Sequence, residues 1–147
     1  MMRIKENEIN RYLILLLAVS ALIRGFLAYF IEFGNDEVYY WTYAMYPDWS
    51  HFDHPPMVGL FIQLFSGNLF FTSEFFLRLS SVICMTVNTY LIFLIGKQVK
   101  NEQTGFYAAL LYTASIYAFV ITGVFILPDT PLSIFTLLSV LFFIKYF

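Results

Sequence analysis

One short segment of the chain, Asn35 to Pro56, gathers four of its ten carboxylates and both of its histidines. It reads NDEVYYWTYAMYPDWSHFDHPP and stands between two stretches that are apolar enough for lipid. A carboxylate in this position can act as a general base towards an acceptor hydroxyl. Carboxylate and imidazole together can also bind a divalent metal such as zinc, manganese or magnesium.

Asp36 and Glu37 come directly after the first apolar stretch. Asn35 can cap a helix whose first turn carries both carboxylates, which then meet the positive end of the helix dipole. This arrangement explains the pair without any function. Their place next to a membrane favours a second interpretation, in which a carboxylate removes a proton from an acceptor and partial burial raises its pKa.

The sequence HFDHPP holds the second group of candidates. Pro55 disfavours a helical conformation at His54, and Pro56 can begin the helix that follows. We therefore expect His51, Asp53 and His54 in non-helical backbone. They could bind a metal through Asp53 with His51 as a further ligand, or they could form a turn in which they bond to nearby backbone groups.

Three more ionisable residues lie in or beside the apolar stretches. Asp129, in ILPDTPL, is expected on the same face as the first loop, although a helix cap also explains it. Arg24 lies well inside the first stretch without a local partner, and an arginine there normally faces a cavity or a counter-charge. Arg78 can pair with Glu74 four residues earlier, or its guanidinium can bind phosphate.

The elements that must position these residues are membrane helices. The 147 residues are 60% hydrophobic and 12% charged, with a mean hydropathy of +0.73, which does not fit a soluble domain. A membrane span needs about 20 apolar residues, and the sequence predicts spans at 12–33, 75–96, 105–127 and 131–147. Because the last of these is still apolar at residue 147, we expect the N-terminal part of a longer protein.

The loop 34–74 contains an apolar stretch, 56–71, that is too short to span and is predicted to be an interfacial helix. Lysine and arginine accumulate on the cytoplasmic side of membranes. Basic residues precede the first span and lie between the second and third, whereas none lies between 34 and 73. The N-terminus is therefore predicted to be cytoplasmic and the loop to be outside.

Aromatic residues crowd the same loop. They can form a belt at the level of the lipid headgroups, or one or two of them can form an apolar platform for a sugar ring. They are Tyr39, Tyr40, Trp41, Tyr43, Tyr46 and Trp49.

Taken together, the motifs DEVYYW, FDHPPMV and PDTPL resemble the N-terminal part of the GT-C polyprenyl-phosphate-dependent glycosyltransferases. The motifs match well the bacterial branch called the family 39 or RgtA/B/C/D-like group, which is related to protein O-mannosyltransferases and to the lipid A aminoarabinose transferase. The resemblance implies an all-α integral membrane protein with a multi-span helical domain and a juxtamembrane helix in its first outside loop. It also implies inverting transfer of a sugar from a polyprenyl phosphate to an acceptor hydroxyl or phosphate on the outer face of the cytoplasmic membrane.

The resemblance also implies roles for particular residues. Asp36 is the expected base with Glu37 beside it, and Asp53 occupies a position that is associated with metal in the aminoarabinose branch. His54 stands where a basic residue contacts the donor phosphate, and Asp129 matches an important acidic residue of the second outside loop. Protein O-mannosyltransferases are thought to work without metal, so the cofactor stays open.

The charges agree with such a reaction, because sugar transfer develops positive charge on the sugar and negative charge on the leaving phosphate. Carboxylates can stabilise the positive charge on the sugar. The negative charge on the phosphate can be stabilised by Arg24, Arg78, His54 or a metal. The expected partners are a polyprenyl-phosphate sugar, an acceptor that is a glycolipid, polysaccharide or protein, and membrane lipids. A net charge of -2 does not favour nucleic acid.

Two other classes of function remain open. A transporter would place ionisable residues in several spans, but 105–127 contains none and 75–96 contains only Arg78. A non-catalytic membrane subunit or a truncated relic would use the aromatic loop to bind a partner. If the chain is a fragment of an enzyme, we expect these 147 residues alone to be inactive because part of the cavity would be missing.

Overall fold

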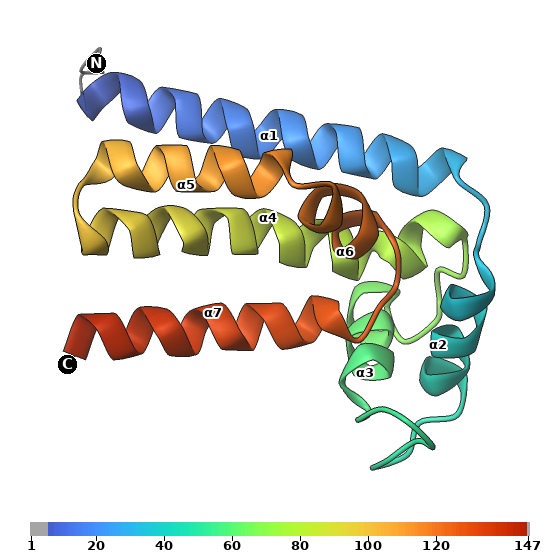
Figure 1. Ribbon diagram of the computed structural model, residues 1–147. Coiled ribbons are helices and arrows are strands. Elements are labelled where there is room, and N and C mark those ends of the chain that lie inside the picture. Colours follow the sequence, from blue (N-terminus) through green and yellow to red (C-terminus); the bar gives the residue numbers. More distant parts are fainter. Residues whose placement is uncertain (1–5, 147) are drawn as a thin grey trace.

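The computed structural model describes residues 6–146, and every regular element within that range is a helix. Four long elements run side by side (Figure 1): α1 (Glu6–Phe30), α4 (Glu74–Val99), α5 (Glu102–Ala114) and α7 (Asp129–Tyr146). The helix α4 is central because it packs against α1, α5 and α7. The predicted all-α, multi-span architecture is thereby confirmed.

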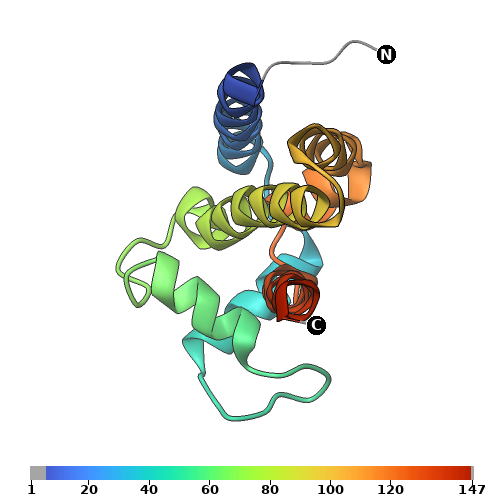
Figure 2. The same cartoon turned by 90° about the vertical axis from the view of Figure 1, so that its left-hand side faces the viewer.

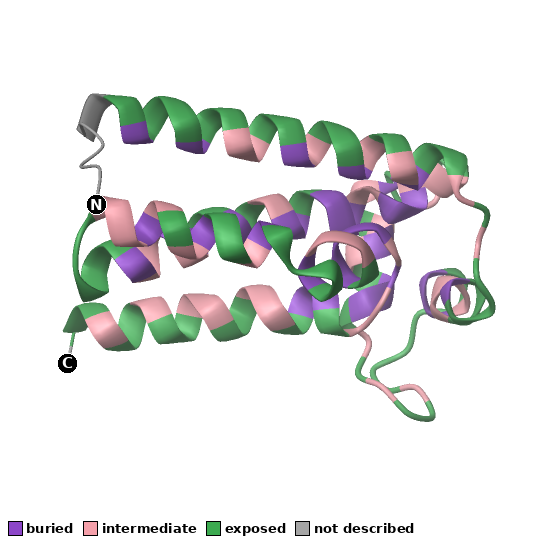
Figure 3. Ribbon diagram, turned by 45° about the horizontal axis from the view of Figure 1, so that its top comes forward, coloured by how far each residue is buried: buried purple, intermediate pink, exposed green. Residues whose placement is uncertain are grey.

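Three of the helices are long and apolar enough to cross a membrane: Glu8–Phe30, Glu74–Val99 and Asp129–Tyr146. Large apolar side chains are exposed along α1 and α7 (Figure 3), for example Leu22 at 73% and Phe143 at 65%. A water-soluble bundle would bury such side chains, so these surfaces suit contact with lipid. Basic residues Arg11, Lys97, Lys100 and Lys145 all lie towards the end of the bundle at which α1 begins and α7 ends.

The third span differs from the sequence expectation of an uninterrupted stretch over 105–127. The helix α5 ends at Ala114, Ser115 has an extended backbone, and a π-helical turn, η1 (Tyr117–Ile121), follows before the short α6 (Thr122–Val124). The two parts meet at an angle of 75°. The Arg24 side chain of α1 packs against this bent segment, with its guanidinium 4.9 Å from the centre of the Phe119 ring.

Two smaller helices, α2 (Asn35–Met45) and α3 (Met57–Phe65), cover the opposite end of the bundle. In the view along α1 and α7, α3 is seen from its side, so it lies across their direction (Figure 2). The two helices meet at Gly59, where an added Cβ would stand 2.7 Å from the Tyr43 carbonyl carbon. An apolar cluster joins this pair to the bundle and consists of Tyr43, Ala44, Val58, Ile62, Leu77 and Ile126.

The start of α2 is stabilised differently from the prediction. Gly34, not Asn35, is the capping residue, and its backbone N–H donates to the Glu37 carboxylate at 3.1 Å. Glu37 is 3% exposed, and its carboxylate also accepts hydrogen bonds from the Ile126 backbone N–H at 3.1 Å and from Arg78. Glu37 therefore connects α2 with the loop that precedes α7.

The ion pair between Glu37 and Arg78 is fully buried. Arg78 donates from Nε and Nη2 to the two carboxylate oxygens at 2.7 and 2.6 Å, which is the bidentate geometry that arginine and carboxylate favour. Its remaining donors reach the free carbonyls at the end of α1, those of Ala28 at 3.2 Å, Glu32 at 3.0 Å and also Ile31. The expected partner Glu74 is 3.9 Å away and 45% exposed, so it is a secondary contact.

We expect Glu37→Gln to destabilise the fold strongly. The substitution leaves the Arg78 guanidinium buried without its counter-charge, which costs about 3–5 kcal/mol. The midpoint of thermal unfolding in detergent measures the effect. Glu74→Gln is the matched control and should change the free energy of unfolding by less than about 1 kcal/mol, because its pair is exposed. Equal effects of the two substitutions would show that the Glu37–Arg78 pair does not hold the fold together.

Candidate active site

Asp36 lies in the first turn of α2, and its side chain is exposed, in contrast to that of its neighbour Glu37. Successive residues of a helix point in different directions, so the two carboxylates that adjoin in sequence face different surroundings. Asp36 lines a cavity of about 450 Å³ whose other walls are Gly34, Asn35, Glu37, Ile121, Phe125 and Leu127. The partial burial expected for this carboxylate is not seen, since Asp36 is exposed.

Asp53 is held by two tyrosines of α2. The hydroxyl groups of Tyr39 and Tyr43 both donate to its Oδ1, the first at 2.9 Å, and the two hydroxyls are 3.1 Å apart. The hydrogen bond from Tyr43, followed by that from Tyr39, holds the pKa of Asp53 below its ordinary value of 3.8. Burial, and then the hydrogen bond to Asp53, raises the pKa of Tyr43. This cluster fastens the loop before α3 to α2.

The two histidines of the loop contact the same tyrosine-rich surface. The His51 ring stacks on Tyr43 with 3.6 Å between centroids, and the His54 ring meets Tyr40 edge to face at 5.6 Å. His54 Nε2 is 3.8 Å from Asp53 Oδ2. Neither histidine lies in a helix, as expected from the prolines that follow.

The arrangement of these side chains does not fit a metal site. Within residues 6–146, no three histidine, cysteine, aspartate or glutamate side chains come close enough together to hold an ion. Asp53 Oδ1 already accepts from two tyrosine hydroxyls, and His51 lies flat against a ring. Metal binding by Asp53 and His51 stays a prediction, and we assign no chemical step to it.

The phenol of Tyr40 is influenced by several carboxylates. This side chain is half-buried, and its burial, followed by the Asp53, Asp36 and Asp129 carboxylates, raises the pKa of the phenol. Asp36 precedes Tyr40 by four residues, which places both on one face of α2. Acids of the first loop and of the loop before α7 therefore both influence this phenol, and their expected roles in the site stay predictions.

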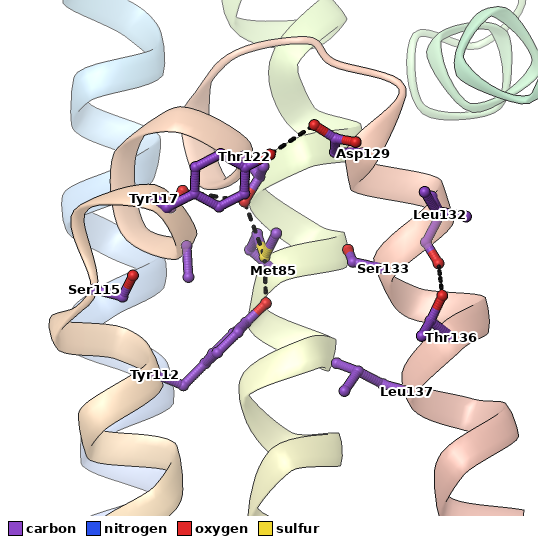
Figure 4. Close-up of a pocket in the computed structure, with 11 residues that line it drawn as sticks. Met85, Tyr112, Ser115, Tyr117, Thr122, Asp129, Leu132, Ser133, Thr136 and Leu137 are labelled. Carbon is purple, nitrogen blue, oxygen red and sulfur yellow. Dashed lines mark hydrogen bonds between the residues drawn. The ribbon is translucent and has the colours of Figure 1, made fainter. Parts of the chain in front are cut away.

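Asp129 begins α7 and stands at one end of a second cavity, of about 370 Å³, between α4, the bent third span and α7 (Figure 4). Its Oδ2 accepts a hydrogen bond of 2.6 Å from the Tyr117 hydroxyl, so the π-helical turn fixes the direction of this carboxylate. Deeper in the cavity the Tyr112 hydroxyl points to the Met85 sulfur at 3.2 Å. Most of the remaining surface is apolar.

Arg24 does not line either of these cavities. Its side chain is fully buried, its guanidinium lies 4.9 Å from the centre of the Phe119 ring, and Gly123 leaves space for its Nε. Among the described residues, none accepts a hydrogen bond from its three guanidinium nitrogens. Binding of substrate by Arg24 stays a prediction, as it does for Arg78, whose nitrogens are occupied by Glu37 and by the end of α1.

Sequence reasoning missed two features of this site. It did not pair Glu37 with Arg78, which are 41 residues apart, and it did not assign the tyrosine hydroxyls that hold Asp53 and Asp129. The spacing of Tyr39 and Tyr43 was available as a signal, because residues four apart lie on one face of a helix.

We expect Asp53→Asn to loosen the loop at residues 46–56 without unfolding the bundle. The amide cannot keep two tyrosine hydroxyls bonded to one charged oxygen, so hydrogen exchange in this segment should rise. In the wild type the lowered pKa of Asp53 stabilises the loop above pH 3.8, and this contribution is lost as the pH falls further. Asp48→Asn is the control, since Asp48 bonds only to the adjacent Trp49 backbone. Unchanged exchange after Asp53→Asn would contradict the assignment.

A family model described as dolichyl-phosphate-mannose-protein mannosyltransferase matches residues 53–147. The match contains Asp53, Arg78 and Asp129, while Asp36 and Glu37 lie before it. No curated protein and no solved structure matches the chain. The resemblance seen in the sequence is confirmed by the family match. The chain belongs to the dolichyl-phosphate-mannose-protein mannosyltransferase family, a GT-C family of membrane glycosyltransferases that use a polyprenyl-phosphate sugar.

Proposed function

We propose that the protein is an inverting glycosyltransferase of the cytoplasmic membrane and that Asp36 is its general base. The observation that carries this proposal is the exposed carboxylate of Asp36 in a cavity at the end of a membrane bundle. The donor is a polyprenyl-phosphate sugar, and the acceptor is a hydroxyl of a glycolipid, a polysaccharide or a protein.

In the proposed reaction, Asp36 takes the proton from the acceptor hydroxyl while its oxygen attacks the anomeric carbon. A new glycosidic C–O bond forms, and the C–O bond to the lipid phosphate breaks with its electron pair. Polyprenyl phosphate leaves on the opposite side of the sugar ring, so the anomeric configuration inverts. Carboxylates near the sugar stabilise the positive charge that develops on it.

Glu37 and Arg78 act in this proposal by positioning. Their buried pair fixes the first turn of α2, from which Asp36 projects. A direct role for Glu37 as a second base would require its carboxylate to give up four hydrogen bonds, from Gly34, Ile126 and two Arg78 nitrogens. Asp36 needs no such rearrangement, and this difference favours it.

The donor phosphate needs a positive partner. His54 is accessible next to Asp53, and we propose that its protonated ring contacts the phosphate. Asp129, held by Tyr117, is proposed to accept hydrogen bonds from sugar hydroxyls. Both residues lie on the same side of the bundle as Asp36.

We further propose that this side faces outwards and that the N-terminus is cytoplasmic. The distribution of charge supports this orientation, because Arg11, Lys97, Lys100 and Lys145 lie at the other end, whereas residues 34–73 contain no lysine or arginine. The positive end of a membrane bundle normally faces the cytoplasm.

We expect Asp36→Asn to lower sugar transfer by at least about 100-fold with its fold retained, because loss of a general base typically costs that much. Membranes that contain the full-length reading frame and are supplied with labelled polyprenyl-phosphate sugars provide the measurement. Glu32→Gln, which alters an exposed carboxylate just before α2, is the matched control and should keep activity. Undiminished transfer by Asp36→Asn would remove Asp36 as the base, and absence of transfer by the wild type from every donor would favour a non-catalytic role.

A further inference from the structure

The cavity of about 370 Å³ between α4, the bent third span and α7 extends well beyond Asp129 (Figure 4). Asp129 stands at one end, and Tyr112 and Leu137 stand at the other. Because each residue of a helix adds about 1.5 Å, the cavity follows α7 for about 12 Å from Asp129 to Leu137. Its volume is in the range of sites that bind small molecules.

The two ends of this cavity lie at different depths of a membrane. The 18 residues of α7 cover about 27 Å, close to the thickness of the hydrocarbon region of a bilayer. Asp129 therefore lies near the boundary with the headgroups, and Leu137 lies within the hydrocarbon. Leu132 and Thr136 line the cavity and are exposed, so it opens towards lipid at the side of the bundle. A ligand can enter it from the membrane.

The hydroxyl groups in the inner part of the cavity are directed at other protein atoms. Ser133 and Thr136 donate to backbone carbonyls of their own helix at 2.8 and 2.9 Å. The Tyr112 hydroxyl points to the Met85 sulfur at 3.2 Å. Hydroxyls that are bonded in this way leave mostly carbon at the surface of the cavity. The inner part therefore suits a hydrocarbon chain better than a sugar.

The outer end of the cavity is polar and negatively charged. Asp129 accepts a hydrogen bond from Tyr117 at Oδ2, and among the described residues none donates to its Oδ1. This oxygen can accept a hydrogen bond from a hydroxyl group of a ligand. Of the described residues that line the cavity, none is a lysine, an arginine or a histidine. The outer end therefore favours an uncharged, hydroxylated group and disfavours an anion.

This charge distinguishes between the lipids that could enter. In polyprenyl phosphate the phosphate is attached directly to the hydrocarbon chain, so a chain in this cavity would bring the phosphate to Asp129. An anionic phospholipid would place its phosphate at almost the same level. In a neutral glycolipid the headgroup carries sugar hydroxyls, from which a carboxylate can accept hydrogen bonds. Charge therefore favours the neutral glycolipid over both anionic lipids.

We propose that this cavity holds a hydrocarbon chain of a neutral glycolipid acceptor, and that Asp129 accepts hydrogen bonds from its headgroup. The inference rests on the proposed function, in which Asp36 activates an acceptor hydroxyl, and it narrows the acceptor to one that is carried by a lipid. The loop before α7 links the two cavities, since Leu127 lines that of Asp36 and Asp129 lines this one.

Photolabelling tests the proposal without sugar transfer. The probe is monoglucosyl diacylglycerol with a diazirine in the middle of one acyl chain, added to the full-length protein in phosphatidylcholine nanodiscs. Phosphatidic acid and polyprenyl phosphate with a diazirine in the chain are the matched anionic probes. Mass spectrometry measures adducts at Tyr112 and Leu137 relative to Leu22, which is exposed on α1. This ratio should be at least about tenfold higher for the glycolipid than for either anionic lipid.

Two variants test the two ends of the cavity. Leu137→Trp fills the inner end and should lower the labelling of Tyr112 by the glycolipid roughly tenfold. Val140→Trp is the matched control, because Val140 is exposed on the same helix outside the cavity, and it should leave the labelling unchanged. Asp129→Asn removes the charge of the outer end and should raise the labelling by phosphatidic acid to that by the glycolipid. A loss of fold cannot produce this gain.

Three results would overturn the proposal. Equal labelling of the wild-type cavity by glycolipid and phosphatidic acid would show contact with bulk lipid only. Stronger labelling by polyprenyl phosphate would assign the cavity to the donor, and absence of adducts at Tyr112 and Leu137 would show that protein fills it.

Sugar transfer, measured separately, keeps this inference distinct from the proposed function. Transfer without labelling of the cavity would refute the acceptor site and leave the glycosyltransferase standing. Selective labelling by the glycolipid without transfer from any donor would refute the proposed function and retain the lipid site.

Discussion

The buried pair of Glu37 and Arg78 is the interaction on which the arrangement of the outer helices depends. Arg78 belongs to the central helix α4 and bonds to the end of α1, while Glu37 bonds to the start of α2 and to the loop before α7. The hydrogen bonds of these two charged side chains therefore connect four segments of the chain. In a low-dielectric interior, such charges are tolerated only when nearly all their donors and acceptors are satisfied, which fixes the relative positions of the segments closely.

This constraint explains why Asp36 and Glu37, although adjacent, differ so strongly in their surroundings. Glu37 must point into the bundle to meet Arg78, and the helix geometry then turns Asp36 towards the cavity. The bent third span contributes the facing wall through Ile121, Phe125 and Leu127. The cavity is thus built from α2, which the ion pair positions, and from the bent segment, in which Gly123 lies against the Arg24 side chain.

Hydrophobic length and charge distribution were enough to predict the helical class, three spans, and an apolar helix between the first two. Contacts between distant segments could not be predicted in the same way. Residues four apart on a helix are neighbours, which suggests Glu74 as the partner of Arg78. Glu37 is the main partner instead, because its carboxylate is buried and accepts hydrogen bonds from Arg78 at both oxygens. The break at Ser115 has no proline or glycine beside it, and the Arg24 side chain that packs against the bent segment comes from a distant part of the sequence.

The distribution of charge around Tyr40 also constrains how a lipid-linked sugar can approach the proposed site. Three carboxylates act on this phenol, and the Arg78 guanidinium is already neutralised by Glu37. A phosphate placed among these acids would be repelled, whereas a sugar that gains positive charge during transfer would be stabilised there. In the proposed reaction the phosphate is kept apart from Asp36 and Asp129, and its proposed contact with His54 requires that the His54 ring offsets the charge of Asp53, which lies 3.8 Å away.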